Sequence, residues 1–184
     1  MTHRHPRLGP PRLWLFTDPR GGDPVAAILR LPRGLGVVFR HYHLPLRQRR
    51  ALFERVRQAV RRRGGTLLLA ASPALAQVWG ADGAYDRSLR RSLGLRGVGV
   101  HNIRELALAR RVGADFVFVS PVFPTRSHPG AAGLGPVRTG LLLGVERAHA
   151  IALGGMNARR WRRLKGLGLA GYAAIDALQA PSRT

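Results

Sequence analysis

The sequence contains no cysteine among its 184 residues. This absence excludes a disulfide framework, a thiolate metal site and a cysteine nucleophile. No apolar stretch reaches the ~18 residues of a membrane-spanning helix, and the N-terminal segment MTHRHPRLGPPR has no apolar core of a secretory signal. We therefore expect a cytoplasmic protein without membrane association.

Acidic residues and lysine are also scarce. The chain has 9 Asp and Glu against 31 Lys and Arg, a net charge of +22, and Lys165 is its only lysine. Such a balance attracts polyanions, so one hypothesis is a basic nucleic-acid-binding protein whose affinity falls steeply with salt. The alternative is that the arginines occupy solvated helix faces, as the spacing of Arg47, Arg50, Arg57 and Arg61 indicates. No nucleic-acid motif is present, so we expect no specific nucleic-acid partner.

Long hydrophobic runs are replaced by short ones that alternate with helical patterns. Apolar runs predict strands over residues 12–17, 34–42, 66–71, 83–86, 96–101, 116–121, 149–155 and 172–178. Helical periodicity and capping residues predict helices over 24–31, 45–64, 72–79 and 102–113, and another helix beginning at Asn157.

This alternation predicts an α/β fold with a parallel sheet. Eight strands indicate a compact (β/α)8 TIM barrel over residues 12–180, preceded by a flexible basic arm over 1–11. Because six residues follow the last strand, we expect the last helix to be missing or vestigial. An open flavodoxin-like sheet is the alternative, which fits the chain length better and the strand count worse.

Polar residues gather where the strands end, which is where α/β proteins carry their chemistry. Gly154-Gly155 follows the seventh strand, either as a phosphate-binding turn or as a simple turn. The loop PVFPTRSHPG follows the sixth strand and offers the hydroxyls of Thr125 and Ser127 and the charges of Arg126 and His128. Three prolines limit its freedom, so we interpret it as a functional loop.

The second strand ends in Arg-His-Tyr-His. Strand alternation predicts that Val38, Arg40 and Tyr42 share one face. An arginine that points into a barrel mouth needs an anion there, from a ligand or from the protein. His41 and His43 have the spacing of a metal-ligand pair, but no third ligand is evident. His101 ends the fifth strand, either as a structural histidine or as a catalytic base.

These motifs together resemble the thiamine phosphate synthase/TenI family. The best-matching stretch is GVGVHNIRELALARRVGADFVFVSPVFPT, residues 97–125, and ALGGMN, LFTDP, ADG and GLAGYAAIDAL also match. The resemblance covers residues 13–178 and implies a compact (β/α)8 barrel of thiamine biosynthesis. Such an enzyme couples hydroxymethylpyrimidine diphosphate to thiazole phosphate, releases pyrophosphate, and uses Mg²⁺ when it is active as a synthase.

The resemblance also implies site residues. Arg40 matches a diphosphate-binding arginine, Thr125 and Ser127 match loop hydroxyls, and Gly154 and Gly155 match glycines that bind the thiazole phosphate. His128 stands where the family has a loop lysine, so Arg40 and His128 are the catalytic candidates.

Other positions depart from the family pattern. Ala70-Ala71 and Arg90 stand where the family has metal-binding acids, so we assign no metal ligand beyond Asp86, a weak candidate. The remaining departures are Val38, Tyr42, Gly99, Pro121 and Asp176. Pro121 occupies the position of the catalytic histidine of the tautomerase branch.

These departures leave a second hypothesis beside the synthase. A catalytically degenerate family member would bind a phosphorylated metabolite without this chemistry. On either hypothesis the expected partner is a small phosphorylated metabolite, and the sequence leaves a homo-oligomer open. If arginines replace the metal, the further candidates at the mouth are Arg87, Arg90 and Arg126.

Overall fold

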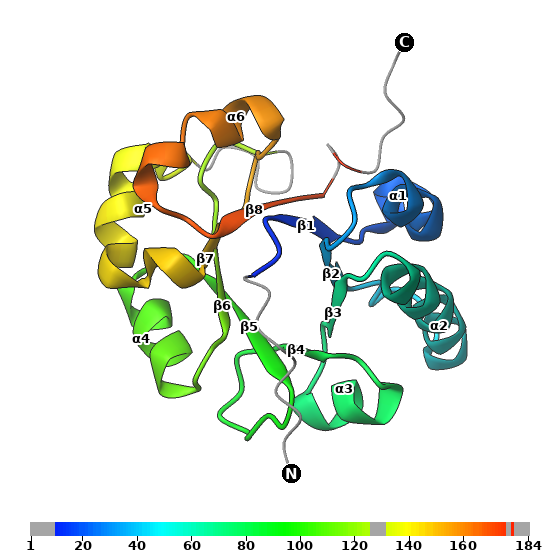
Figure 1. Ribbon diagram of the computed structural model, residues 1–184. Coiled ribbons are helices and arrows are strands. Elements are labelled where there is room, and N and C mark those ends of the chain that lie inside the picture. The colour runs from blue at the N-terminus through cyan, green and yellow to red at the C-terminus, as the bar shows by residue number, and fades with distance from the viewer. Residues whose placement is uncertain (1–9, 126–131, 176–177, 179–184) are drawn as a thin grey trace.

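Eight parallel strands close into a barrel in a computed structural model that describes residues 10–125, 132–175 and 178. Each strand pairs with its neighbours in sequence, and β8 pairs with β1 to close the ring (Figure 1). The strands are β1 (Leu13–Phe16), β2 (Gly36–Phe39), β3 (Thr66–Leu69), β4 (Gly83–Tyr85), β5 (Leu95–Val100), β6 (Phe116–Val119), β7 (Ala150–Ala152) and β8 (Gly171–Ala174). The predicted barrel is confirmed, and the open sheet is wrong.

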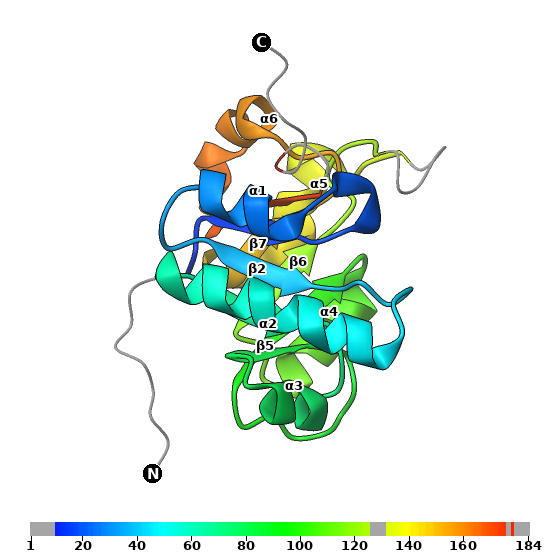
Figure 2. The ribbon, with the colours of Figure 1, turned by 90° about the vertical axis from the view of Figure 1, so that its right-hand side faces the viewer.

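Helices surround the barrel (Figures 1 and 2). They are α1 (Pro24–Arg30), α2 (Leu46–Arg62), α3 (Pro73–Trp79), α4 (Ile103–Arg111), α5 (Gly135–Leu143) and α6 (Ala158–Arg162), with short 3₁₀ turns at Pro19–Gly21, Gly144–His149 and Lys165–Leu167. The sequence did not predict α5, because glycine, proline and threonine make GPVRTGLLL a weak helix former. Within the described ranges no helix is long and apolar enough to cross a membrane.

Aromatic rings fill the barrel interior. The ring centroids of Trp14 and Phe16 lie 5.2 and 5.1 Å from that of Phe118, and Phe16 meets Tyr85 at 5.3 Å. Large rings need small neighbours, and a Cβ on Gly36 would lie 2.2 Å from the Trp14 ring. This alternation of large and small residues closes the short strands around a packed core rather than a pore.

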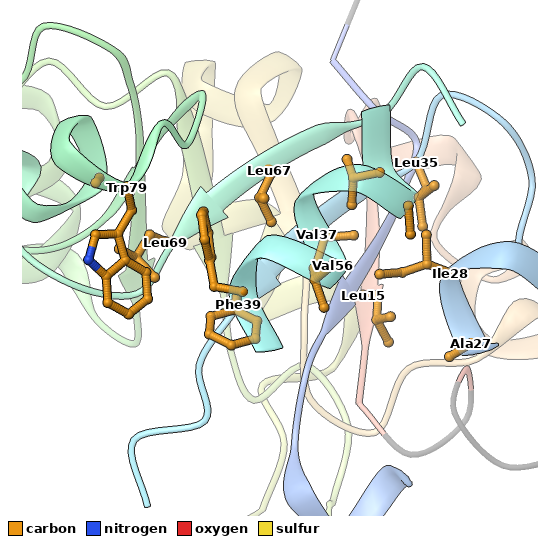
Figure 3. Packing of buried hydrophobic residues seen from close by; sticks show 14 of the residues in the cluster. Leu15, Ala27, Ile28, Leu35, Val37, Phe39, Val56, Leu67, Leu69 and Trp79 are labelled. Atoms are coloured by element: carbon orange, nitrogen blue, oxygen red, sulfur yellow. The ribbon is translucent and has the colours of Figure 1, made fainter. Parts of the chain in front are cut away.

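The outward faces of the strands pack against the helices. Figure 3 shows one such cluster, in which Leu15, Val37 and Phe39 from the strands meet side chains from the helices. Its helical members include Ile28, Val56 and Trp79, which are 5% exposed or less. Val38 lies in the interior cluster, so the predicted alternation along β2 is confirmed up to Arg40.

Beyond Arg40 the predicted alternation is wrong. β2 ends at Phe39 rather than Tyr42, because His41 adopts a left-handed backbone with φ of 45°. This conformation ends an extended strand, and the Tyr42 side chain that follows it is 64% exposed.

The other strand boundaries shift in a similar way. β7 was predicted over residues 149–155 and ends at Ala152, since positive φ angles at Gly154 and Gly155 turn the chain. β8 ends at Ala174 rather than at 178. The expected N-terminal arm and last helix fall on residues that lie, except for 10, 11 and 178, outside the described ranges.

The packing of Trp14 on Gly36 generates a stability prediction. Gly36→Ala should lower the free energy of unfolding by about 1–3 kcal/mol, because the new methyl group overlaps the indole ring. Urea denaturation followed by circular dichroism measures the change.

Gly166→Ala is the matched control, since nothing lies within 4 Å of a Cβ at that position. Equal stability of the two variants would contradict the packing argument.

Candidate functional site

Arg40 reaches into the carboxyl-terminal mouth of the barrel. Its guanidinium carbon lies 5.6 Å from the centre of the Phe16 ring, which belongs to the interior cluster. Its Nε donates to the Thr17 carbonyl at 3.0 Å, and its Nη2 donates to the Asp18 carboxylate at 2.8 Å. Asp18 therefore supplies the anion that an arginine at this position requires.

Asp18 is shared between two arginines. The Nε of Arg20 donates to its carboxylate at 2.7 Å, beside the contact from Arg40. The hydrogen bond from the Arg20 side chain is the main cause that lowers the Asp18 pKa to about 2. Burial opposes this shift, and the Arg20 amide and the charge of Arg40 lower the pKa further. One carboxylate between two guanidinium groups leaves this part of the mouth with a net positive charge.

A hydrogen-bond network holds the backbone under Arg40. The Thr17 Oγ1 accepts from the Arg40 amide at 3.0 Å and lies 3.0 Å from Nδ1 of His41. Since Oγ1 already accepts one hydrogen bond, its own proton is free to donate to an unprotonated Nδ1. Burial is the main cause that lowers the pKa of His41, and the nearby His43 lowers it further. His41 is therefore neutral at neutral pH and packs as a structural element.

Gly154 and Gly155 form a turn that contacts the strand-six loop. The amides of Val122 and Phe123 donate to the carbonyls of Leu153 and Gly154 at 2.9 and 3.1 Å. The φ angles of the two glycines are 88° and 60°, and a Cβ on Gly154 would lie 2.7 Å from the Pro121 Cα. Only glycine fits this left-handed, closely packed turn.

The amide donors of this turn are not used by the backbone of the described residues. Among the described residues, neither the Gly154 nor the Gly155 amide donates a backbone hydrogen bond. Thr125 lies half-buried on the adjoining loop. Ser127 and His128, and with them Arg126, lie outside the described residues, so their assigned roles stay predictions.

Arg160 is a basic residue at this turn that the sequence analysis missed. Its Nη1 donates to the Gly155 carbonyl, and its guanidinium lies 5.2 Å from the centre of the Phe123 ring. Asn157 caps the helix by accepting from the Arg160 amide at 2.9 Å, which places the arginine one turn beyond the glycines. The useful sequence signal was an arginine three residues after a capping Asn that follows the Gly-Gly turn.

The described residues at this end of the barrel do not form a preassembled magnesium centre. The Asp86 carboxylate accepts from the amide and hydroxyl of Ser88 and is thus turned to its own loop. Across the described ranges, no three His, Cys, Asp or Glu side chains are grouped to hold a metal ion, His41 and His43 included. Ala70 and Ala71 offer no side-chain oxygen at the end of β3.

Two further arginines proposed for the mouth take different positions. The Nη2 of Arg87 would lie 3.4 Å from a Cβ on Gly99, and its Nη1 donates to Glu105 at 3.0 Å, so Arg87 lies at the carboxyl end of β5. Arg90 lines a cavity of about 410 Å³ together with Arg96 and Asp115, next to the amino ends of β5 and β6. The placement of Arg90 at the mouth was therefore wrong.

The fold and the site together define a class of protein. It is a small (β/α)8 barrel whose carboxyl end presents arginines, a hydroxyl and a glycine turn, a donor set suited to phosphorylated ligands. The chain belongs to the thiamine monophosphate synthase family, whose model matches residues 31–178.

Individual relatives agree with this family. The chain is 31% identical to the thiamine-phosphate synthase of Chloroflexus aurantiacus, over 92% of this chain and 85% of that protein. It is 30% identical to the thiamine biosynthesis bifunctional protein ThiM/ThiE of Symbiobacterium thermophilum, over 94% of this chain and 39% of that longer protein. The barrel superimposes on a thiamine phosphate pyrophosphorylase from Pyrococcus furiosus with a TM-score of 0.76, at 22% identity, over 92% and 88% of the two chains.

The low pKa of Asp18 generates a pH prediction. Because folding lowers this pKa from 3.8 to about 2, Asp18 stabilises the fold above pH 3.8, and the contribution is lost as the pH falls towards 2. The stability difference between wild type and Asp18→Asn should therefore be largest near pH 5, at about 2 kcal/mol, and shrink towards pH 2.5.

Urea denaturation across this pH range measures the difference. Asp23→Asn is the control, because the Asp23 side chain is more exposed than that of Asp18 and lies 3.9 Å from the closest nitrogen of Arg55. A pH-independent difference for Asp18→Asn would contradict the ion-pair assignment.

Proposed function

We propose that this chain is a thiamine phosphate synthase, which couples hydroxymethylpyrimidine diphosphate to thiazole phosphate. The observation that supports this proposal is a barrel mouth with cationic donors at two separate places. Arg40 lies at the ends of β1 and β2, and Arg160 lies beside the Gly154-Gly155 turn after β7. Two donor sets at one mouth suit two substrates that each carry phosphate.

The proposed reaction is a displacement at the pyrimidine methylene carbon. The thiazole nitrogen forms a bond to this carbon, while the bond from the carbon to the diphosphate oxygen breaks and pyrophosphate leaves with the electron pair. Negative charge grows on the leaving oxygen, so a fixed guanidinium at Arg40 stabilises the transition state. The glycine amides, Arg160 and Thr125 would hold the monophosphate of the thiazole.

A second candidate function is the binding of a phosphorylated metabolite without turnover. The observation that favours it is the pair Ala70-Ala71, which removes the side-chain oxygens that the family resemblance places at the end of β3. A cytoplasmic location and a homo-oligomer remain predictions, as does the absence of a specific nucleic-acid partner. Cell fractionation, light scattering and salt-dependent DNA binding address these three predictions.

The synthase proposal is tested by turnover of both substrates. Purified protein should form thiamine phosphate and pyrophosphate in equal amounts. Arg40→Ala should lower kcat by about 100-fold or more, the effect typical of removing one donor that stabilises developing charge. Arg47→Ala is the matched control, because Arg47 is exposed on the first turn of α2.

The metabolite-binding candidate makes a different prediction. Without turnover, thiazole phosphate at 100 times its Kd should still stabilise the protein by about 2.7 kcal/mol, and Gly155→Ala should weaken this effect. If an active control synthase turns over and this protein does not, the synthase proposal fails. If thiazole phosphate also leaves the melting temperature unchanged, the metabolite-binding candidate fails too.

A further inference from the structure

Arg49 is a buried arginine without a carboxylate partner in the described part of the chain. It lies in the first turn of α2 and is 8% exposed. Its Nε donates to the Arg40 carbonyl at 2.8 Å, and its Nη2 donates to the Ala70 carbonyl at 3.0 Å. Arg40 and Ala70 are the first residues after β2 and β3, so the guanidinium lies at the carboxyl ends of these two strands.

Aromatic rings surround the same guanidinium. Its central carbon lies 5.8, 5.1 and 5.5 Å from the ring centres of Phe39, Tyr42 and Trp79. Figure 3 shows Phe39 and Trp79 near Leu69, at one end of the buried cluster. Ring faces attract a cation, but they do not cancel its charge.

The charge of Arg49 is therefore uncompensated. Burial lowers its pKa, but an arginine stays protonated in proteins because its ordinary pKa exceeds 12. An unpaired charge in a protein interior is costly unless a partner balances it. Asp18, which follows β1 at this end of the barrel, is already shared by Arg20 and Arg40.

One nitrogen of Arg49 remains available to a ligand. Within the described ranges, Nη1 of Arg49 donates no hydrogen bond. Since it is not one of the fully enclosed polar atoms without a partner, it is in contact with solvent. The small exposed part of this side chain thus includes a free donor. The Nε of the same guanidinium donates to the Arg40 carbonyl, and the Arg40 side chain enters the barrel mouth.

We propose that Arg40 and Arg49 form a diphosphate subsite that works without a metal ion. Arg49 supplies, from α2, a permanent positive charge at the end of β3, where Ala70 and Ala71 cannot bind a metal. A guanidinium offers N–H donors that match phosphate oxygens and carries its charge at every physiological pH. This inference rests on the proposed function, since it assigns the diphosphate end of the substrate to this subsite.

The competing interpretation is that Arg49 only ties α2 to the ends of β2 and β3. A purely structural Arg49 predicts that its replacement lowers stability and leaves anion binding unchanged in the folded fraction. Binding and stability must therefore be measured separately on the same variants.

The experiment titrates the full chain with inorganic pyrophosphate in a calorimeter at about 150 mM salt, which screens exposed charges. One series contains EDTA and the other contains Mg²⁺. We expect binding in EDTA, with a Kd that Mg²⁺ changes by less than about threefold, under 1 kcal/mol. Arg49→Gln should weaken binding at least tenfold.

Arg47→Gln is the matched control, because it removes the same charge from an exposed position of the same helical turn. Its Kd should equal that of the wild type. Equal weakening by both variants would indicate bulk charge alone and overturn the subsite.

A second variant keeps the inference testable if Arg49→Gln does not fold. Ala71→Asp leaves Arg49 in place and adds a carboxylate next to Ala70, whose carbonyl accepts a hydrogen bond from Arg49. It should weaken pyrophosphate binding in EDTA, because the new carboxylate neutralises the guanidinium, and Mg²⁺ should restore part of the affinity. Unchanged binding in EDTA would overturn the subsite.

The outcomes separate this inference from the proposed function. Pyrophosphate binding that requires Mg²⁺ overturns the metal-free subsite and leaves the synthase proposal standing. Metal-free binding that Arg49→Gln removes, in a protein without turnover, supports the subsite and contradicts the synthase proposal.

Discussion

The packing of large rings against glycine inside a very small barrel is the constraint on which the rest of the structure depends. Strands of three to six residues can close a ring only if their inward side chains fill the centre without gaps. Trp14 against Gly36, and Phe118 against Gly97, meet this requirement. Because the rings occupy the interior, the candidate site lies at the carboxyl ends of the strands rather than inside the barrel.

At those ends the charge balance is unusual. Asp18 neutralises one of the two guanidinium groups it contacts, Arg49 has no acid among the described residues, and Arg160 lies over the Gly-Gly turn. Among the described residues, Arg49 and Arg160 are fixed by backbone carbonyls and aromatic rings rather than by acids. A guanidinium held in this way keeps its charge available to a ligand, whereas an ion pair would cancel it.

The arginines at these strand ends offer a physical explanation for Ala70 and Ala71, which stand where the family resemblance places metal-binding residues. Mg²⁺ prefers oxygen ligands that usually include one or two carboxylates, and the chain as a whole has few acids. A buried arginine on α2 is a chemically reasonable substitute, because it brings a fixed positive charge without needing a ligand set of its own.

The sequence by itself determined the barrel, since alternating apolar strands and amphipathic helices leave few ways to bury both faces of a parallel sheet. It also determined Arg40, Gly154 and Gly155 as candidates, because they follow strands, and strand ends share one edge. Tertiary structure alone decided the rest. Asp18 as the partner of Arg40, the left-handed His41 that ends β2, and the positions of Arg49 and Arg160 all depend on contacts between distant segments. A one-dimensional pattern cannot encode which carbonyl or ring a long, flexible arginine side chain will meet, because that depends on how the segments pack.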